Sequence, residues 1–283
     1  MGYAAPMDLP DDAPTPDQLR EAFAVPTHGE VSLSDYSTAT GLYSKSLAKK
    51  VIAANAEAIA PLAHKLYAGG ERKLLVVLQG MDTSGKDSTV EALFSRTPPL
   101  GVGVAAFKAP SKTELAHDYL WRVHQRVPAA GQIVVFNRSH YEDVLVVKVR
   151  GFAPEDDVER RYAQINDFER MLTETGTTVL KFMLHQSFEA QGERLRERLE
   201  EADKRWKFNP GDLDDRALWP AFMDAYETML QRTSTEHAPW IVVPADTRKA
   251  RKAIIGTLVR DALEAMELSY PDPGYRPGDY DIV

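Results

Sequence analysis

Short apolar runs alternate with stretches of helical spacing over residues 72–268, and this alternation limits the folds that the chain can adopt. Most of the five runs are rich in β-branched or aromatic residues, and all are short enough for strands: 74–78, 102–107, 133–136, 178–184 and 240–243. Beside them, helices are predicted over 88–95, 114–126, 156–175, 189–201, 218–232 and 248–268. Strands that alternate with helices form parallel sheets covered on both faces. We therefore expect an α/β fold, a three-layer sandwich around a central five-stranded parallel sheet.

The two ends of the chain look different from this central part. Residues 1–30 are rich in Pro and Asp, so we expect an N-terminal arm over 1–40 with little structure of its own. A helix is predicted over 44–68, with a break or kink near Pro61. Residues 269–283 are rich in Pro and Gly and predict an irregular C-terminal tail. These limits leave one main domain over 41–268.

Composition excludes several classes of function. The net charge is -8, so the surface as a whole does not attract nucleic acid, and any polyanion must bind at a local basic site. There is no apolar run of membrane-spanning length and no secretory signal pattern at the N-terminus, so no membrane partner is expected. The absence of cysteine excludes thiol nucleophiles and cysteine-ligated zinc, and it fits a cytoplasmic protein.

The strongest motif is the run GMDTSGK over residues 80–86, which fits G-x-x-x-x-G-K. It follows the first predicted strand and precedes a predicted helix, which is the context that a phosphate-binding loop requires. Glycines let successive N–H groups point inward around phosphate oxygens, the helix N-terminus adds its dipole, and Lys86 neutralises the phosphoryl group. The predicted phosphate-binding residues here are Gly80, Thr83, Ser84, Gly85, Asp87 and Ser88.

Two acids depart from the common form of this loop. Asp87 occupies the position where Ser or Thr usually meets Mg²⁺. Asp82 lies inside the loop, where an acid beside phosphate is repulsive unless a cation intervenes. We therefore predict that Asp82, and less firmly Asp87, face Mg²⁺. The alternatives are a turn-forming role for Asp82 and a charge on the helix dipole for Asp87.

A second motif, NRSHYED over residues 137–143, follows the third predicted strand. Asn137 stands where related loops hold Mg²⁺ with an acid. Arg138 comes at a strand end, so it is predicted to point into the ligand crevice of an open α/β sheet. An ion pair between Arg138 and Glu142 is the structural alternative. His140 as a phosphohistidine is less favoured than His140 as a hydrogen-bonded structural residue.

Residues 189–216 combine a charged helix with the turn Asn-Pro-Gly-Asp, and they predict a lid. Cations on a mobile lid close over phosphates and exclude water, which separates transfer from hydrolysis. The alternative is a solvated helix whose interleaved acids form ion pairs. The candidate phosphate-binding cations of the lid are Arg194, Arg198, Lys204 and Lys207.

Several of these segments together resemble the type 2 polyphosphate kinases: GMDTSGKD, FNRSHYEDVLVVKV, INDFERML, LKFMLHQSFEAQGERLRER and ADKRWKFNPGD. The resemblance runs from about residue 49 to 246 and includes AFKAP and ELAHDYLWRVH within 106–124. It implies a P-loop kinase core with a helical lid, and Mg²⁺-dependent, reversible phosphoryl transfer between inorganic polyphosphate and adenine nucleotides, AMP or ADP. The motif at 137–143 looks like the branch that uses both.

The resemblance also implies roles at matching positions. Asp82, Lys86 and Arg138 would be the catalytic residues, and Asp82 would hold Mg²⁺ with Asp87 or Glu142. Asn137 replaces an acid that many relatives carry, which affects one metal contact. Nucleotide contacts are expected from Asn137, His140, Tyr141 and Glu142. The family's tendency to form dimers or tetramers predicts a homo-oligomer.

Three candidate functions remain from the sequence. The first is the polyphosphate-dependent nucleotide kinase, with a basic path for the polyanion whose candidate residues are Lys45, Lys49, Lys50, Arg72 and Lys108. The second is an ATP-dependent nucleoside monophosphate kinase on the same core. The third is a P-loop regulatory module that binds nucleotide with almost no turnover.

Overall fold

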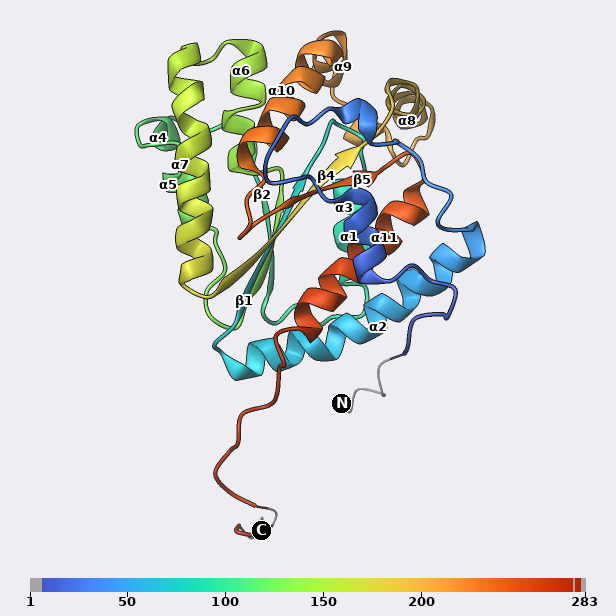
Figure 1. Cartoon of the computed structure of the whole chain (residues 1–283), viewed down its shortest axis with the longest axis vertical. Coiled ribbons are helices and arrows are strands. Elements are labelled where there is room, and N and C mark those ends of the chain that lie inside the picture. Colours follow the sequence, from blue (N-terminus) through green and yellow to red (C-terminus); the bar gives the residue numbers. More distant parts are fainter. Residues whose placement is uncertain (1–6, 277, 281–283) are drawn as a thin grey trace.

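A five-stranded parallel sheet forms the centre of the molecule, as a computed structural model that describes residues 7–276 and 278–280 shows (Figure 1). The strand order is β2-β3-β1-β4-β5. Its strands are β1 (Lys73–Gln79), β2 (Val102–Ala106), β3 (Ile133–Asn137), β4 (Thr177–His185) and β5 (Trp240–Pro244). The expectation of a three-layer α/β sandwich with a five-stranded parallel sheet is confirmed.

β1 is the central strand because its side chains are apolar on both faces. Residues 74–78 are fully buried, and the strand pairs with β3 on one side and β4 on the other. A strand without alternation can be stable only where helices cover both faces of the sheet. All strands run in one direction, so their carboxyl ends meet at one edge, where ligands bind in folds of this class.

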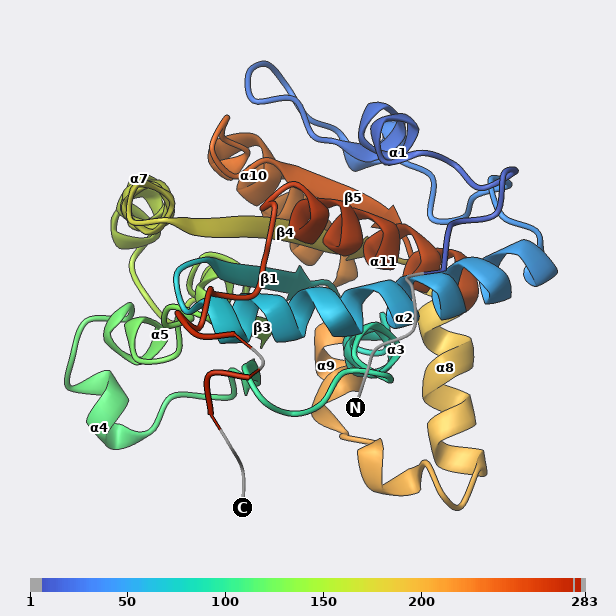
Figure 2. The same ribbon diagram turned by 90° about the horizontal axis from the view of Figure 1, so that it is seen from below.

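Helices form the two outer layers (Figures 1 and 2). One face of the sheet is covered by α6 (Val146–Arg150), α7 (Glu155–Glu174) and α10 (Trp219–Thr233). The other is covered by α1 (Pro16–Phe23), α2 (Lys45–Gly69), α3 (Lys86–Leu93) and α11 (Arg248–Glu264). The shorter helices are α4 (Lys112–Leu115), α5 (Trp121–His124), α8 (Phe188–Glu200) and α9 (Gly211–Ala217), with 3-10 turns η1 (Leu33–Asp35), η2 (His140–Asp143) and η3 (Arg205–Lys207).

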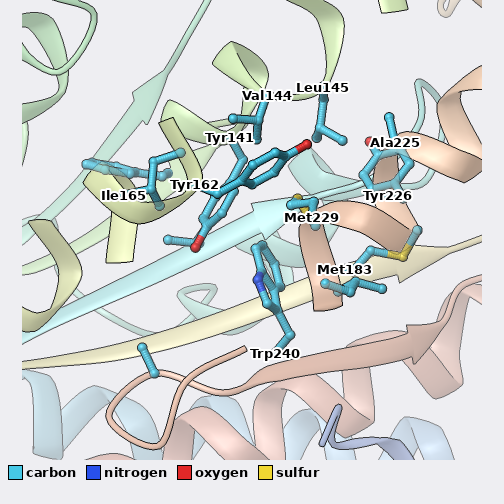
Figure 3. Close-up of a cluster of buried hydrophobic side chains, with 14 of the residues drawn as sticks. Tyr141, Val144, Leu145, Tyr162, Ile165, Met183, Ala225, Tyr226, Met229 and Trp240 are labelled. Carbon is cyan, nitrogen blue, oxygen red and sulfur yellow. The ribbon is translucent and has the colours of Figure 1, made fainter. Parts of the chain in front are cut away.

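The core under α7 and α10 is unusually aromatic. Figure 3 shows Tyr141, Tyr162 and Trp240 within this cluster, beside Met229 of α10. The rings of Tyr141 and Trp240 meet edge to face, with centroids 4.7 Å apart. Such edge-to-face contact adds to the free energy gained from burial. The packing fixes η2, the turn that follows β3, against the sheet.

Of the break or kink predicted near Pro61, the break was wrong, because α2 runs as one helix through it, and the kink stays a prediction. Proline removes one N–H and so leaves the carbonyl of Glu57, one turn earlier, without its helical donor. The rest of α2 compensates by burial, since its inner face packs along α11 over most of its length. Tertiary packing here outweighs the local preference of one residue.

The N-terminal arm is more structured than expected. α1 begins with a capping box in which Thr15 and Gln18 exchange hydrogen bonds, and it buries Leu19 and Phe23 against the α11 side of the core. Val25 then donates its N–H to the carbonyl of Trp240 (2.8 Å), beside an antiparallel bridge between Ala24 and Ile241. The arm is therefore part of the fold and covers the outer edge of β5.

The single helix predicted over 114–126 was also wrong. Two one-turn helices, α4 and α5, occupy this segment instead. The carboxylate of Asp118 accepts the N–H of Leu120 (3.0 Å), a local turn that competes with helix continuation. The predicted irregular tail is confirmed over residues 269–276 and 278–280, while the helix predicted to reach residue 268 ends at Glu264. Among the described residues, no helix has the length and apolar character needed to cross a membrane.

Candidate active site

A cavity of about 850 Å³ lies at the carboxyl ends of β1, β2 and β3. The loop after β1, the residues after β2 and the end of β3 form one wall, while α8, α9 and the start of α11 form the other. Ten lysine and arginine side chains line it against four acids, although the chain as a whole is acidic. The cavity therefore suits a ligand with several negative charges.

The consecutive carbonyl groups of the loop at 80–84 are all engaged in hydrogen bonds. Each accepts a hydrogen bond from a side chain, and the donors in chain order are Lys86 for Gly80 and Met81, Gln186 for Asp82, Arg194 for Thr83 and Arg251 for Ser84. Among the described residues, the N–H groups of Asp82, Thr83, Gly85 and Lys86 have no hydrogen-bond partner. A loop with fixed carbonyls and free N–H groups is a cradle for anions.

Glycine is required at two positions of this loop. A Cβ at Gly80 would lie 2.7 Å from the carbonyl oxygen of Leu184. A Cβ at Gly85 would lie 2.3–2.5 Å from the guanidinium atoms of Arg251. Gly80 and Ser84 are part of the loop but do not line the cavity, whereas Thr83, Gly85 and Ser88 do.

Lys86 begins α3 with its amine buried beneath the loop. The amine donates to the carbonyl of Gly80 at 2.7 Å, and its side chain still lines the cavity. Burial lowers the pKa of Lys86 to about 8, against the opposing attraction of Asp82. Lys86, the lysine predicted to bind phosphate, therefore lies at the loop and lines the cavity. Burial makes its positive charge energetically unfavourable.

Asp82 and Arg138 face each other across the cavity floor. Arg138 forms an ion pair and a hydrogen bond with Asp82, and its backbone lies in the left-handed region at φ 62°. That conformation is strained for a residue other than glycine, and such strain gathers at functional sites. Burial raises the pKa of Asp82, but Lys86 and Arg138 outweigh it and lower the pKa below its ordinary value. Among the described residues, Arg138 forms its salt bridge with Asp82 and not with Glu142, which was the structural alternative.

Asp212, at the start of α9, is a site residue that the sequence analysis missed. Its carboxyl group shares a hydrogen bond with Asp82, and burial together with the negative charge of Asp82 raises the pKa of Asp212 to about 6. Arg198 also donates to Asp212 at 3.0 Å. The signal was the Asn-Pro-Gly-Asp turn, which indicated a lid loop but gave no reason to select its last residue.

Asp87 and Asn137 line the same cavity beside the Asp82–Arg138 pair. The amide of Asn137 donates to the carboxylate of Asp87, and both side chains line the cavity. Glu142 lies behind Arg138, outside the cavity lining, and accepts from Gln79 at 3.1 Å; burial raises the pKa of this carboxyl group.

His140 and Tyr141 do not reach the cavity. Both are fully buried, and each contacts Glu169 of α7, through Nε2 at 3.2 Å and through the hydroxyl at 2.7 Å. The nucleotide contacts expected of them are therefore not direct ones in this structure. The turn η2 explains this placement, because it directs the side chains of His140 and Tyr141 into the core below the sheet. Arg138, just before this turn, lines the cavity instead.

The four predicted lid cations all line the cavity, but they differ in their partners. Arg194 is buried and donates to backbone carbonyls of residues 83, 245 and 246. Arg198 pairs with Asp212, and Lys204 pairs with Glu201 at 2.6 Å. Lys207 lies over the ring of Trp206. Arg194 is thus a structural clamp as well as part of the wall.

The basic path expected outside the loop is only partly present. Lys108 lines the cavity, but the other four candidates do not: Lys45, Lys49, Lys50 and Arg72. Three cations of α11 line it instead, Arg248, Arg251 and Lys252. The only sequence signal for these three residues was the basic run at 248–252, shortly after the last strand. Periodicity alone would assign this run to the solvent-exposed start of a helix.

Within residues 7–276 and 278–280, no three acidic or histidine side chains are grouped to hold a metal ion by themselves. The carboxyl groups of Asp82 and Asp212 nonetheless lie close together, and the negative charge of Asp82 helps to raise the pKa of Asp212 to about 6. Mg²⁺ is commonly bound by one or two carboxylates, with water and substrate phosphates as the other ligands. The donor set therefore fits Mg²⁺ that arrives with phosphate.

The sheet, the phosphate loop and the cationic lid define a kinase-type transferase with a P-loop fold. A family model described as Polyphosphate kinase 2 (PPK2) matches residues 42–271, and the chain belongs to this family. The family resemblance drawn from the sequence is confirmed.

The regions that match this chain cover most of the length of each relative. An AMP/ADP-polyphosphate phosphotransferase from Meiothermus ruber is 48% identical over 229 residues, which are 81% of this chain and 86% of that protein. An ADP-polyphosphate phosphotransferase from Rhodopseudomonas palustris is 36% identical over 81% of this chain and 83% of its own length. The crystal structure of polyphosphate kinase 2 from Arthrobacter aurescens TC1 superposes with a TM-score of 0.87 at 40% identity, over 99% of this chain and 96% of that one.

Proposed function

We propose that this chain transfers a phosphoryl group from inorganic polyphosphate to AMP and to ADP, reversibly and by direct in-line attack. The observation that carries the proposal is the strongly cationic cavity around a phosphate loop in an acidic chain. The AMP/ADP-polyphosphate phosphotransferase of Meiothermus ruber, at 48% identity, supports the choice of donor and of both acceptors.

In this proposal the residues act through position and charge, because phosphoryl transfer needs no covalent nucleophile. The free N–H groups of the loop and Lys86 hold the phosphates that flank the transferred group. Arg138, held by its ion pair to Asp82, faces the charge that develops on that group. The lid cations and the residues of α9 close the other side against water.

Mg²⁺ is the proposed cofactor, with Asp82 and Asp212 as its protein ligands and Asp87 and Asn137 beside them. When bound, it would neutralise phosphate charge between the two substrates. Glu142 is proposed as a counter-charge behind Arg138 rather than as a ligand, since it does not line the cavity. Association with further copies of the chain remains a prediction, to be checked by sedimentation.

The test is product analysis with Mg²⁺ and polyphosphate, with AMP and ADP in separate reactions. We expect ATP from ADP, and ADP followed by ATP from AMP. ATP from ADP alone would remove AMP from the proposal. No product with polyphosphate, but ADP from ATP and AMP, would replace it with an ordinary monophosphate kinase.

The variant Lys86→Ala gives this assay its negative control. It removes the loop cation, so turnover should fall by at least about 100-fold. Lys65→Ala on α2 removes a lysine from outside the cavity and should leave turnover unchanged. Activity of Lys86→Ala within a few-fold of the parent would contradict the assignment of the loop.

A further inference from the structure

Arg251 of α11 is a buried guanidinium in an unusual setting. Its side chain is 1% exposed, yet among the described residues it forms no salt bridge with any carboxylate. Buried charges in proteins are normally paired, because removal from water is costly. The nearest charges are those of Arg194 and Arg248, which repel it.

Most contacts of Arg251 go to the phosphate loop and the first turn of α3, and a longer one, 3.4 Å from Nη1, goes to the carbonyl of Ala245 after β5. Nη1 donates to the carbonyl of Ser84 at 2.7 Å, Nε to the hydroxyl of Thr89 at 3.1 Å, and Nη2 to the hydroxyl of Ser88 at 3.0 Å. The guanidinium also lies directly under Gly85, so close that a Cβ there would overlap it. It therefore fastens the end of the loop and the first turn of α3 at once.

These neutral groups accept hydrogen bonds from Nε, Nη1 and Nη2 of the guanidinium but leave its charge uncompensated. Burial and the two neighbouring arginines lower the pKa of Arg251 to about 9, which shows how unfavourable that charge is without an anion. The residue also lines the cavity. A phosphate chain bound on the loop would supply the negative charge that Arg251 lacks at this place.

We propose that Arg251 is a positioning residue for the phosphate loop, and that its unpaired charge is neutralised by the phosphate chain bound on the loop. The proposal rests on the proposed function for the identity of that chain. It explains why the loop needs glycine at 85, since the guanidinium occupies the space of a side chain.

The experiment measures the rise in unfolding temperature that inorganic tripolyphosphate produces without any nucleotide. A ligand that binds only the folded protein stabilises it according to its affinity. The set is the parent, Arg251→Gln, Arg251→Lys and Arg260→Gln. Arg260 lies on the same helix but pairs with Glu264 at 2.7 Å, so its variant controls for the loss of one positive charge.

We expect Arg251→Gln to bind tripolyphosphate about tenfold more weakly, by the strength of a charged contact, while Arg260→Gln binds like the parent. Arg251→Lys keeps the charge and should keep most of the affinity. In turnover, Arg251→Gln should raise KM for polyphosphate more than it lowers kcat. A folded Arg251→Gln protein with the parent's tripolyphosphate shift would overturn the proposal.

If Arg251→Gln does not fold, Arg251→Lys decides the matter. Retention of at least half of the parent's tripolyphosphate shift supports the proposal, and loss of the shift in the folded lysine variant overturns it. A parent protein that responds to ADP but not to tripolyphosphate would count against polyphosphate as donor. The ADP shifts of the same variants would then decide the role of Arg251 separately.

Discussion

The amine of Lys86 lies among carbonyl oxygens of its own loop, and this burial makes its charge sensitive to pH. Its pKa is lowered to about 8, so the side chain is mostly charged at pH 7 and mostly neutral at pH 9. An anion binds better to the charged form. Phosphate affinity should therefore fall as the pH rises through 8, and binding should take up a proton.

The corresponding prediction is that tripolyphosphate binds about tenfold more weakly at pH 9 than at pH 7, by the linkage of one proton. Titration calorimetry measures both affinities and, in two buffers of different ionisation heat, the proton uptake. Lys86→Arg keeps its charge over this range and is the matched control. An equal fall in affinity in Lys86→Arg would assign the pH effect to another group.

At this scale the sequence predicted the residues that belong to a continuous motif. Asp82, Lys86 and Arg138 could be selected because Asp82 and Lys86 belong to the loop motif between β1 and α3, and Arg138 directly follows β3. Asp212 and Arg251 could not, because their roles depend on contacts across the fold, with Asp82 and with Gly85. No local pattern distinguishes them from an ordinary turn acid and a helix-surface arginine.

At the scale of elements, a buried ionic cluster joins β4, α7, α10 and η2. Lys181 of β4 donates to Glu169 at 2.6 Å, to the hydroxyl of Tyr141 at 2.9 Å and to the carbonyl of Thr233 at 2.7 Å. Burial opposes ionisation of Glu169, but Lys181 and His140 outweigh it and lower its pKa to about 2. The cluster anchors η2, and through it the strained turn at Arg138.

Lys181→Met should therefore destabilise the protein by about 3–5 kcal/mol, because it leaves the carboxylate of Glu169 buried without its cation. The double variant Lys181→Met with Glu169→Gln removes both charges and should lose less. Urea unfolding measures each free energy. Lys49→Met, the same change at an exposed position of α2, should stay within about 0.5 kcal/mol of the parent. A double variant as unstable as the single one would show that the charge pair is not the cause.

The strands were the most predictable elements, since each apolar run is short and bounded, and the observed limits differ from the expected ones by at most one residue at either end. The amount of structure in the N-terminal arm was underestimated, although the sequence contains a helix signal there. Thr15, Pro16 and Gln18 form a helix start, and the apolar residues Leu19 and Phe23 follow one turn apart. The composition of residues 1–30 was given more weight than this capping pattern. The continuous helix through Pro61 depends on packing against α11, which no local rule contains.

At the scale of the whole molecule, residues of α8, η3 and α9 line the cavity, and Arg194 of α8 donates to the carbonyl of Thr83 in the phosphate loop. Figure 2 shows α8 and α9 joined by the connection that contains η3. Between the two helices, Arg205, Trp206 and Lys207 are exposed. If phosphate draws the lid cations inward, this connection becomes less accessible.

Trypsin should accordingly cleave after Arg205 and Lys207 in the free protein, and tripolyphosphate should slow that cleavage several-fold. Mass spectrometry of the fragments over time provides the rates. Cleavage after Arg72, an exposed site at the opposite end of β1, is the internal control and should not change. Protection at Arg72 to the same degree would mean that tripolyphosphate inhibits the protease or stabilises the chain globally.

The antiparallel bridge between Ala24 and Ile241 makes the two edges of the sheet differ in their exposure to solvent. The N-terminal arm covers the edge strand β5 at this bridge, whereas β2, the strand at the other edge, carries Val104 at 55% exposure. An open edge is a template on which a foreign strand can add. Within the described residues, such a template is therefore offered at the β2 edge and not at the part of β5 that the arm covers. A version trimmed to begin after residue 30 would offer two, and edge-to-edge aggregation could then propagate in both directions.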